Sequence, residues 1–341
     1  MIRCIGACVL AMLLAVPARA QVPAGGTPFK VQLDWTLDAR FAGFVVAREH
    51  GFYRALGLDV MLLPGGPDLH PSAAIRSGDA DVAVDWLGEA LAAREHGVQM
   101  VNVAQIQQVP ALQLICRRDA HVLSTADLPG HALGIWPNGR DLTLRQLLAK
   151  LELRTDGRAG GVSLVPQGPG VEALTDGRLP CVSAMGYADF WTLLDQGQTP
   201  QTLTVFDYRA EKVGLPEDGL YVNGRRLDQP AFVARLARFI GATTHGWVWA
   251  IGNPMEAAAL LAPEGSGRDL DEQARMLIEY GKLVSDGTTP LLYFRPESYE
   301  AAVTLMMATK QAPIIEKHPS RALTSSVWQA SRAFENGPAA P

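Results

Sequence analysis

Apolar and polar residues alternate over short stretches and then recur at helical spacing, and this change of period repeats along most of the chain. In the first instance residues 30–35 alternate and are β-prone, and from Phe41 onward the apolar residues Phe41, Phe44, Val45 and Phe52 recur at helical spacing. Gly57 stands where such a helix should end, and 58–63 reads as the next strand. A strand, a helix and a strand of this length predict a parallel crossover unit.

The same alternation continues to about residue 208 and predicts two consecutive α/β units. The expected strands cover 81–86, 100–106, 112–118, 132–136, 162–166, 181–187 and 203–208, and the expected helices cover 69–77, 87–96, 141–151, 171–178 and 188–195. Beyond them the pattern is helical only, over 230–251, 254–261, 270–284 and 297–310. Alternation of this kind is typical of largely parallel sheets flanked by helices, so we predict an α/β fold.

Two such units suggest two lobes with a ligand cleft between them. We expect the chain to pass from one lobe to the other near 117–124 and to return near 208–223, with the C-terminal helices packing back on the first lobe. The expected segments are a flexible leader over 21–28, a discontinuous first lobe over 29–118 and 219–330, a second lobe over 119–218 and a flexible tail over 331–341.

The first twenty residues have a different pattern. Arg3 provides a basic start, 5–16 is an apolar run, and Ala18-Arg19-Ala20 is an A-x-A cleavage signal. These features are typical of a secretory signal peptide cleaved after Ala20, and the run is too short for a membrane-spanning helix. No later run is long enough to cross a bilayer, so we expect a soluble, exported protein.

Composition and net charge limit the classes of partner that the protein can bind. The chain has 341 residues, of which 48% are hydrophobic and 19% charged, as is ordinary for a globular protein of two lobes. Loss of Arg3 and Arg19 with the signal peptide would change the formal net charge from −5 to −7. A mildly acidic chain without a basic stripe argues against nucleic acid and anionic membrane surfaces as partners.

Two cysteines, Cys116 and Cys181, would remain after cleavage, and each lies in a strand that we predict to be buried. Export would permit a disulfide between them. Buried cysteines also occur as inert free thiols. Two free thiols are the state we expect, with a disulfide as the alternative.

The sequence lacks the usual signatures of catalysis and metal binding. It contains no G-x-x-x-x-G-K-[ST], no H-E-x-x-H and no G-x-S-x-G. Gly168-Pro169-Gly170 is not followed by a third glycine and predicts a turn that enters a helix. The seven histidines form no pair at ligand spacing on one helix, so we expect neither a metal nor a cofactor.

Aromatic and acidic side chains gather where the predicted strands end, which is where ligands bind in parallel sheets. Aromatic faces can stack a flat ring, and carboxylates can accept hydrogen bonds from its N–H groups. A core position fits Trp86 equally well, and helix capping fits Asp85 and Glu89. The candidate ligand-binding residues are Trp35, Asp38, Asp85, Trp86, Glu89, Trp136, Tyr187 and Asp189.

Several stretches resemble the NMT1/THI5-like (SsuA/THI5-like) family, which contains receptors for thiamine pyrimidine precursors and related pyrimidine synthases. The resemblance covers about two thirds of the chain. It is carried by LDW at 33–35, AGFVVAREHGFYRALGLDV at 42–60, IRSGDADVAV at 75–84, ALAAREHGV at 90–98, STADLPGHALGI at 124–135 and GWVWAIGNPMEAA at 246–258.

This resemblance implies a two-lobed periplasmic binding protein-like fold of type II that closes on its ligand by a hinge motion. It implies a monomeric periplasmic receptor that hands a small solute to an inner-membrane ABC permease. The expected solute is a hydroxymethyl- or formylamino-pyrimidine, with riboflavin or a sulfonate as alternatives. Trp35 and Tyr187 would stack the ring, the acids of the first lobe would accept its protons, and Trp136 and Asp189 would close from the second lobe.

Charge and the family's enzymes bear on these alternatives. Apart from Arg40 and Arg140, the expected pocket offers acids rather than bases, which disfavours a sulfonate or phosphate. Arg140 could instead form an ion pair across the cleft. The synthases use a lysine that holds pyridoxal phosphate and a histidine, and the matching positions here are Asp85 and Glu89. We therefore expect that the chain is not an enzyme. A sensor domain that signals to another membrane partner is a further alternative to the receptor.

Overall fold

The computed structural model describes residues 28–136, 140–264, 267–308 and 314–335. The expected signal peptide, nearly all of the leader and the end of the tail lie outside these residues. Residues 331–335 were predicted as part of a flexible tail, but they complete a C-terminal helical segment. Among the described helices, none combines the length and the apolar character that a membrane span requires.

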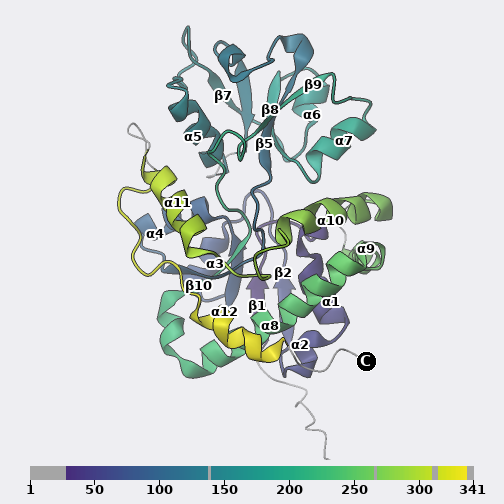
Figure 1. The fold of residues 1–341 in the computed structure, drawn as a ribbon, viewed down its shortest axis with the longest axis vertical. Helices are drawn as coiled ribbons and strands as arrows, with labels where there is room; N and C mark the ends of the chain where they lie inside the picture. The colour runs from purple at the N-terminus through teal and green to yellow at the C-terminus, as the bar shows by residue number, and fades with distance from the viewer. Residues whose placement is uncertain (1–27, 137–139, 265–266, 309–313, 336–341) are drawn as a thin grey trace, which may run out of the picture.

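Two five-stranded sheets form the centres of two lobes, one above the other in Figure 1. Both sheets are mixed, because β10 is antiparallel to its neighbours in the first sheet and β5 is antiparallel to its neighbours in the second. The first sheet has the order β2 (Val60–Leu63), β1 (Phe29–Gln32), β3 (Val82–Asp85), β10 (Gly219–Asn223) and β4 (Met100–Gln105). The second has the order β7 (Ser163–Pro166), β6 (Ala132–Ile135), β8 (Cys181–Met185), β5 (Leu112–Arg117) and β9 (Leu203–Asp207).

Helices cover both sheets, and the long C-terminal helices lie against the first lobe, as expected (Figure 1). The first lobe begins with α1 (Ala42–Glu49), α2 (Phe52–Ala55), α3 (Pro71–Ser77) and α4 (Leu87–Glu95), and the second contains α5 (Leu142–Lys150), α6 (Glu172–Thr175) and α7 (Asp189–Asp195). The C-terminal helices are α8 (Pro230–Gly252), α9 (Pro254–Leu261), α10 (Leu270–Val284), α11 (Pro296–Met307) and α12 (Ser326–Ser331).

The prediction of the first crossing between lobes was wrong. Residues 112–117 were expected to end the first lobe, but they form β5 inside the second sheet, so the chain crosses at 106–111. The return crossing was expected near 208–223 and lies at 208–218, because residues 219–223 form β10, a strand that the sequence pattern did not predict. A period of two identifies a strand but does not say which sheet it joins, and this is why β5 was misplaced.

Two glycines allow the closest approach between α1 and α8. A Cβ atom on Gly246 would lie 1.9 Å from the carbonyl oxygen of Gly43, and one on Gly43 would lie 2.5 Å from the indole ring of Trp247. The helices therefore pack backbone against backbone at this point, which only a residue without a side chain permits.

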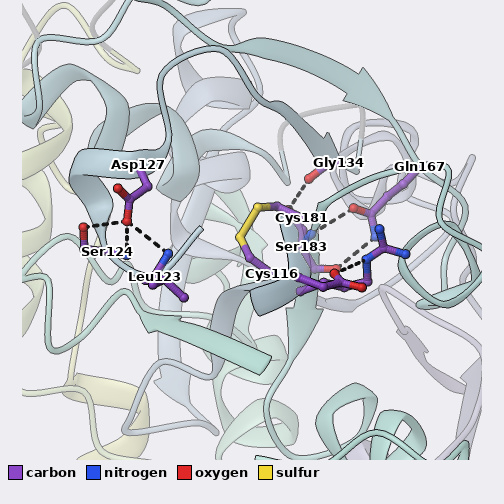
Figure 2. The surroundings of a disulfide bond; sticks show 10 residues. Cys116, Leu123, Ser124, Asp127, Gly134, Gln167, Cys181 and Ser183 are labelled. Carbon is purple, nitrogen blue, oxygen red and sulfur yellow. Dashed lines mark hydrogen bonds and ion pairs between the residues drawn. A yellow bond between two sulfur atoms is a disulfide. The ribbon is translucent and has the colours of Figure 1, made fainter. Parts of the chain in front are cut away.

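Cys116 and Cys181 form a disulfide, so the expectation of two free thiols was wrong (Figure 2). Both cysteines are buried, as predicted. The antiparallel register of β5 and β8 places them directly opposite each other, with their Cα atoms 4.0 Å apart. The sequence could not show this pairing, because it depends on the sheet that β5 joins.

Candidate ligand-binding site

A cavity of about 280 Å³ lies between the two lobes and is lined from both. On the first lobe the lining follows β1 and continues at the start of α10, and on the second it follows the ends of β6, β7 and β8. Parallel strands bring these loops to one edge of each sheet, so the two edges face each other across the cavity. Five of the predicted residues line it: Trp35, Asp38, Trp136, Tyr187 and Asp189.

The other three predicted residues lie behind this cavity. Asp85 is buried and accepts a hydrogen bond on Oδ1 from the backbone N–H of Trp86 at 2.9 Å. Trp86 and Glu89 line a smaller second cavity on the far side of Arg140. A core position was the alternative to ligand binding for Trp86, and Trp86 is indeed a core residue. A place at a helix start was the alternative for Glu89, which lies in the first turn of α4.

The aromatic side chains of the cavity are held in place by the protein. The indole N–H of Trp136 donates to the carbonyl oxygen of Gly168 at 3.0 Å. The ring of Tyr187 packs edge-on against Tyr280, with centroids 5.0 Å apart. Aromatic rings fixed by such contacts need no reordering before they stack a ligand, which favours binding of a flat ring.

Two carboxylates from opposite lobes face the same cavity. Asp38 accepts on Oδ1 from the backbone N–H of Arg40 at 3.0 Å and so caps the turn Ala39–Phe41. Asp189 accepts on Oδ2 from the backbone N–H of Met185 at 2.6 Å. Burial raises the pKa of Asp189 to about 6, so it is mostly ionised at neutral pH. Both carboxylates are suited to accept hydrogen bonds from a ligand's N–H groups.

Arginines make a larger contribution to the cavity than was expected. Arg40, Arg140 and Arg268 all line it. The expectation that the pocket offers acids rather than bases apart from Arg40 and Arg140 was wrong for Arg268. Arg268 was missed because it precedes α10 in a loop, where the pattern gives no reason to place it near the strand ends. Its guanidinium is paired with the carboxylate of Glu272.

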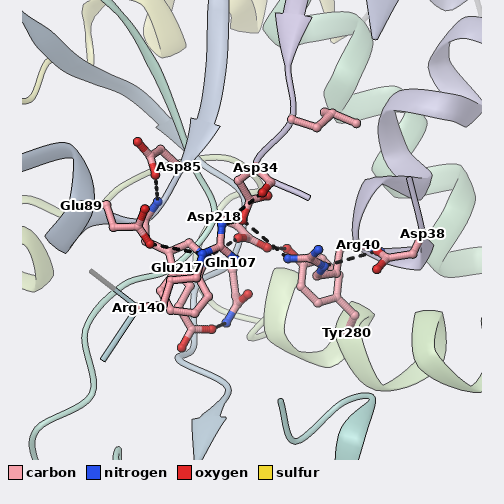
Figure 3. A network of polar contacts seen from close by, with 12 residues as sticks. Asp34, Asp38, Arg40, Asp85, Glu89, Gln107, Arg140, Glu217, Asp218 and Tyr280 are labelled. Carbon is pink, nitrogen blue, oxygen red and sulfur yellow. Dashed lines mark hydrogen bonds and ion pairs between the residues drawn. The ribbon is translucent and has the colours of Figure 1, made fainter. Parts of the chain in front are cut away.

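Arg140 forms the ion pair across the cleft that the sequence left open (Figure 3). It comes from the second lobe, and both of its partners lie on the first lobe. Its Nη2 atom is 3.1 Å from Oδ2 of Asp34, and its Nε atom is 3.4 Å from Oε1 of Glu89. Arg40 also pairs with Asp34, at 3.6 Å. Burial raises the pKa of Glu89 to about 7, against the lowering effect of Arg140.

One carboxylate joins the two crossings between the lobes. Glu217, on the return crossing, accepts hydrogen bonds from the backbone N–H groups of Ala111 at 3.1 Å and Leu112 at 2.9 Å, and from the side-chain amide of Gln107 at 2.6 Å. Burial raises the pKa of Glu217 to about 7. The next residue, Asp218, accepts from the hydroxyl of Tyr280 at 2.6 Å. The two crossings between the lobes are thus joined by a buried polar network (Figure 3).

Within the described residues, no group of three or more His, Cys, Asp or Glu side chains is arranged to hold a metal ion. The donor set of the cavity is instead that of a site for an organic molecule: aromatic faces, carboxylates and guanidinium groups.

A family model described as NMT1/THI5 like matches residues 38–257, which is more than half of the chain. The chain belongs to the NMT1/THI5-like family. The matched region contains the first crossover unit from Asp38 onward, the whole second lobe, the return crossing, all of α8 and the first half of α9.

Two relatives have names that concern thiamine chemistry. A formylaminopyrimidine-binding protein of Halalkalibacterium halodurans is 27% identical over 244 residues, which are 68% of this chain and 69% of that protein. A protein of Haemophilus influenzae named for thiamine biosynthesis is 25% identical over 132 residues, which are 38% of this chain and only 40% of that relative.

Solved structures share the two-lobed fold. The periplasmic aliphatic sulphonate binding protein SsuA of Escherichia coli superposes with a TM-score of 0.59 at 17% identity, covering 82% of this chain and 86% of that one. The desulfurization enzyme DSZB superposes with a TM-score of 0.56 at 15% identity, covering 89% and 99%. The predicted fold class, two sheets flanked by helices as in periplasmic binding proteins, is therefore confirmed.

Proposed function

We propose that this chain is the monomeric periplasmic solute-binding receptor of an ABC importer, and that its solute is a small flat heterocycle carrying N–H donors. A thiamine pyrimidine precursor of the hydroxymethyl- or formylamino-pyrimidine type is the first candidate. One observation supports this most: Trp35, Trp136 and Tyr187 line one cavity together with the carboxylates of Asp38 and Asp189. Aromatic faces and acceptors in that combination match an aminopyrimidine.

The size of the cavity supports a single-ring solute over riboflavin. At about 280 Å³ it lies just below the usual range for small-molecule pockets, roughly 300–1,000 Å³. A pyrimidine fits such a space, whereas a three-ring flavin with a ribityl chain needs more room.

A sulfonate is the second candidate, because three arginines line the cavity. Arg40 and Arg140 are, however, engaged by the carboxylates of Asp34, Asp38 and Glu89. Arg268 is paired with Glu272 as well, so an anion would have to compete with carboxylates for each of the three arginines, and Asp38 and Asp189 would repel it. Charge therefore favours the heterocycle.

Catalysis has less support than binding, although an enzyme shares the fold. The two cysteines of the described chain are consumed in the disulfide and lie away from the cavity. In the resemblance to the synthases, Asp85 and Glu89 match the positions of the lysine and the histidine. The cavity offers carboxylates, guanidiniums and a phenol, and we assign none of them a covalent role.

The test is thermal unfolding of the chain from Gln21 in the presence of aminopyrimidines, riboflavin, taurine or an aliphatic sulfonate. A solute at about a hundred times its dissociation constant adds about 2.7 kcal/mol to the stability and visibly raises the melting temperature. We expect this for an aminopyrimidine and expect Trp35→Ala to abolish it. Trp328→Ala is the matched control, since Trp328 lies in α12, packs on Tyr293 and does not line the cavity. A shift with the sulfonate alone would refute the proposed solute.

A further inference from the structure

Four side chains of the first lobe surround the guanidinium of Arg140. Its carbon atom lies 5.1 Å from the ring centroid of Trp35 and 5.0 Å from that of Trp86, so the cation lies against two indole faces. Its nitrogens pair with the carboxylates of Asp34 and Glu89. We call Asp34, Trp35, Trp86 and Glu89 the cation box.

The cation box is built for a positive charge and receives it from the other lobe. Asp34 is completely buried, and its Oδ1 atom has no hydrogen-bond partner among the described residues. Arg140 comes from between β6 and α5 and also donates to the backbone carbonyl oxygen of Asp34 at 3.1 Å. A desolvated guanidinium between aromatic faces and carboxylates is a strong arrangement for a cation.

The side chain of Arg140 is also the partition between the two cavities. It lines the main cavity together with Trp35, and it lines the smaller cavity together with Trp86 and Glu89. Without this side chain, the main cavity would extend to Trp86 and Glu89. This explains why residues predicted from the strand ends to contact the ligand lie behind the cavity instead.

We propose that Arg140 is an internal ligand of the cation box and thereby sets the charge specificity of the site. With the box filled, the carboxylates of Asp34 and Glu89 are not available to the cationic group of a solute, and the cavity selects a neutral or weakly basic one. Without Arg140, the box accepts a guanidinium or amidinium group from solution. The selection of the solute rests on the proposed function, whereas the cation site does not.

The cation site is tested by chemical rescue, with methylguanidinium chloride in the low millimolar range as the probe and sodium chloride as the salt control. All four box residues belong to the first lobe, so the site persists whether or not the lobes close. We expect methylguanidinium to raise the melting temperature of Arg140→Ala and to leave that of the wild type unchanged. Arg145→Ala is the matched control, because Arg145 pairs with Asp141 outside both cavities. An equal response of all three proteins would overturn the proposal.

A second variant covers a failure of Arg140→Ala to fold. Glu89→Gln combined with Arg140→Ala leaves one uncompensated acid fewer, and we expect methylguanidinium to stabilise it less than the single variant. If methylguanidinium stabilises neither variant, nor restores either to the soluble fraction, the cation box does not exist as we describe it.

Charge specificity is tested with benzamidine and benzamide, flat molecules of similar shape that differ in charge. We expect the ratio of their affinities to shift toward benzamidine by at least tenfold in Arg140→Ala relative to the wild type. An unchanged ratio despite rescue by methylguanidinium would confine Arg140 to a structural role and refute its role in specificity. Failure of every aminopyrimidine to bind would refute the proposed function and leave the rescue result standing.

Discussion

Glu217 is a buried acid, and its burial favours the protonated form of the carboxyl group. The backbone N–H groups and the Gln107 amide that donate to it compensate the carboxylate in part, but burial is the larger effect and raises its pKa from 4.5 to about 7. For an acid with a raised pKa in the folded state, the stabilising contribution is complete below pH 4.5. It is lost as the pH rises to about 7, because the unfolded chain ionises first.

We predict that Glu217→Gln flattens the pH dependence of stability. The shift in pKa corresponds to about 3 kcal/mol, most of which is lost between pH 5 and pH 8. The free energy of unfolding of the wild type should therefore fall by about 2 kcal/mol more than that of Glu217→Gln over this interval, measured by urea titration. Glu211→Gln, at the partly exposed end of the same crossing, should retain the wild-type slope. Parallel curves for all three proteins would contradict the prediction.

At this scale the sequence indicated the residues that follow strands and missed those that do not. Trp35, Trp136 and Tyr187 were found because the end of a predicted strand fixes their position. Arg268 comes from a loop that follows Tyr187 by 81 residues along the chain (268 − 187), and only the folding of α10 onto the first lobe brings it to the cavity. No local pattern records such a contact.

Helices α1 and α8 meet where Gly43 faces Gly246, and this contact makes a prediction at the scale of elements. Gly246→Ala should push the two helices apart, because its methyl group would overlap the carbonyl oxygen of Gly43. We expect the free energy of unfolding to fall by about 2 kcal/mol, as for other overpacked cores, in a denaturant titration.

Gly252→Ala is the matched control in the same helix. A Cβ atom there meets nothing within 4 Å, and alanine favours a helix over glycine by about 1 kcal/mol. This variant should be as stable as the wild type or more so. Equal loss of stability in both variants would indicate a general effect of alanine in α8 rather than the contact with α1.

Periodicity predicted most elements to within a few residues, including α8 and α10, whose apolar faces run along many turns. It failed where the information is not local. The pairing of β5 with β8, and with it the disulfide, depends on which sheet β5 joins. The short α12 was not predicted, because six residues hold too few turns to show a period.

Among the described residues Arg140 makes two ion pairs between the lobes and Arg275 makes a third, and they differ in burial. Arg140 and its partners Asp34 and Glu89 are at most 11% exposed, whereas Arg275 of α10 and Asp195 of α7 are 35% and 54% exposed. An exposed pair contributes about 1 kcal/mol or less, while loss of one partner of a buried pair costs about 3–5 kcal/mol. The buried pair should therefore dominate the relation between the lobes.

We predict that Arg140→Ala separates the lobes in the absence of solute, because opening lets water reach Glu89, which loses its ion pair, and Asp34, which keeps only Arg40. Small-angle X-ray scattering should give a larger radius of gyration for Arg140→Ala than for the wild type. Arg275→Ala should leave the radius of gyration unchanged. If the radius of gyration increased for Arg275→Ala but not for Arg140→Ala, the exposed pair rather than the buried one would hold the lobes together, contrary to the prediction.

The order of strands in the first sheet has a consequence for the sequence of events during synthesis. All strands of the second sheet come from one uninterrupted stretch, 112–207, whereas β10 lies between β3 and β4 and follows that stretch in the chain. A nascent chain can therefore complete its second sheet while β4 still has no neighbour in the first. Strands β3 and β4 thus leave the ribosome long before β10, which pairs between them. The first lobe begins to form first and is completed last.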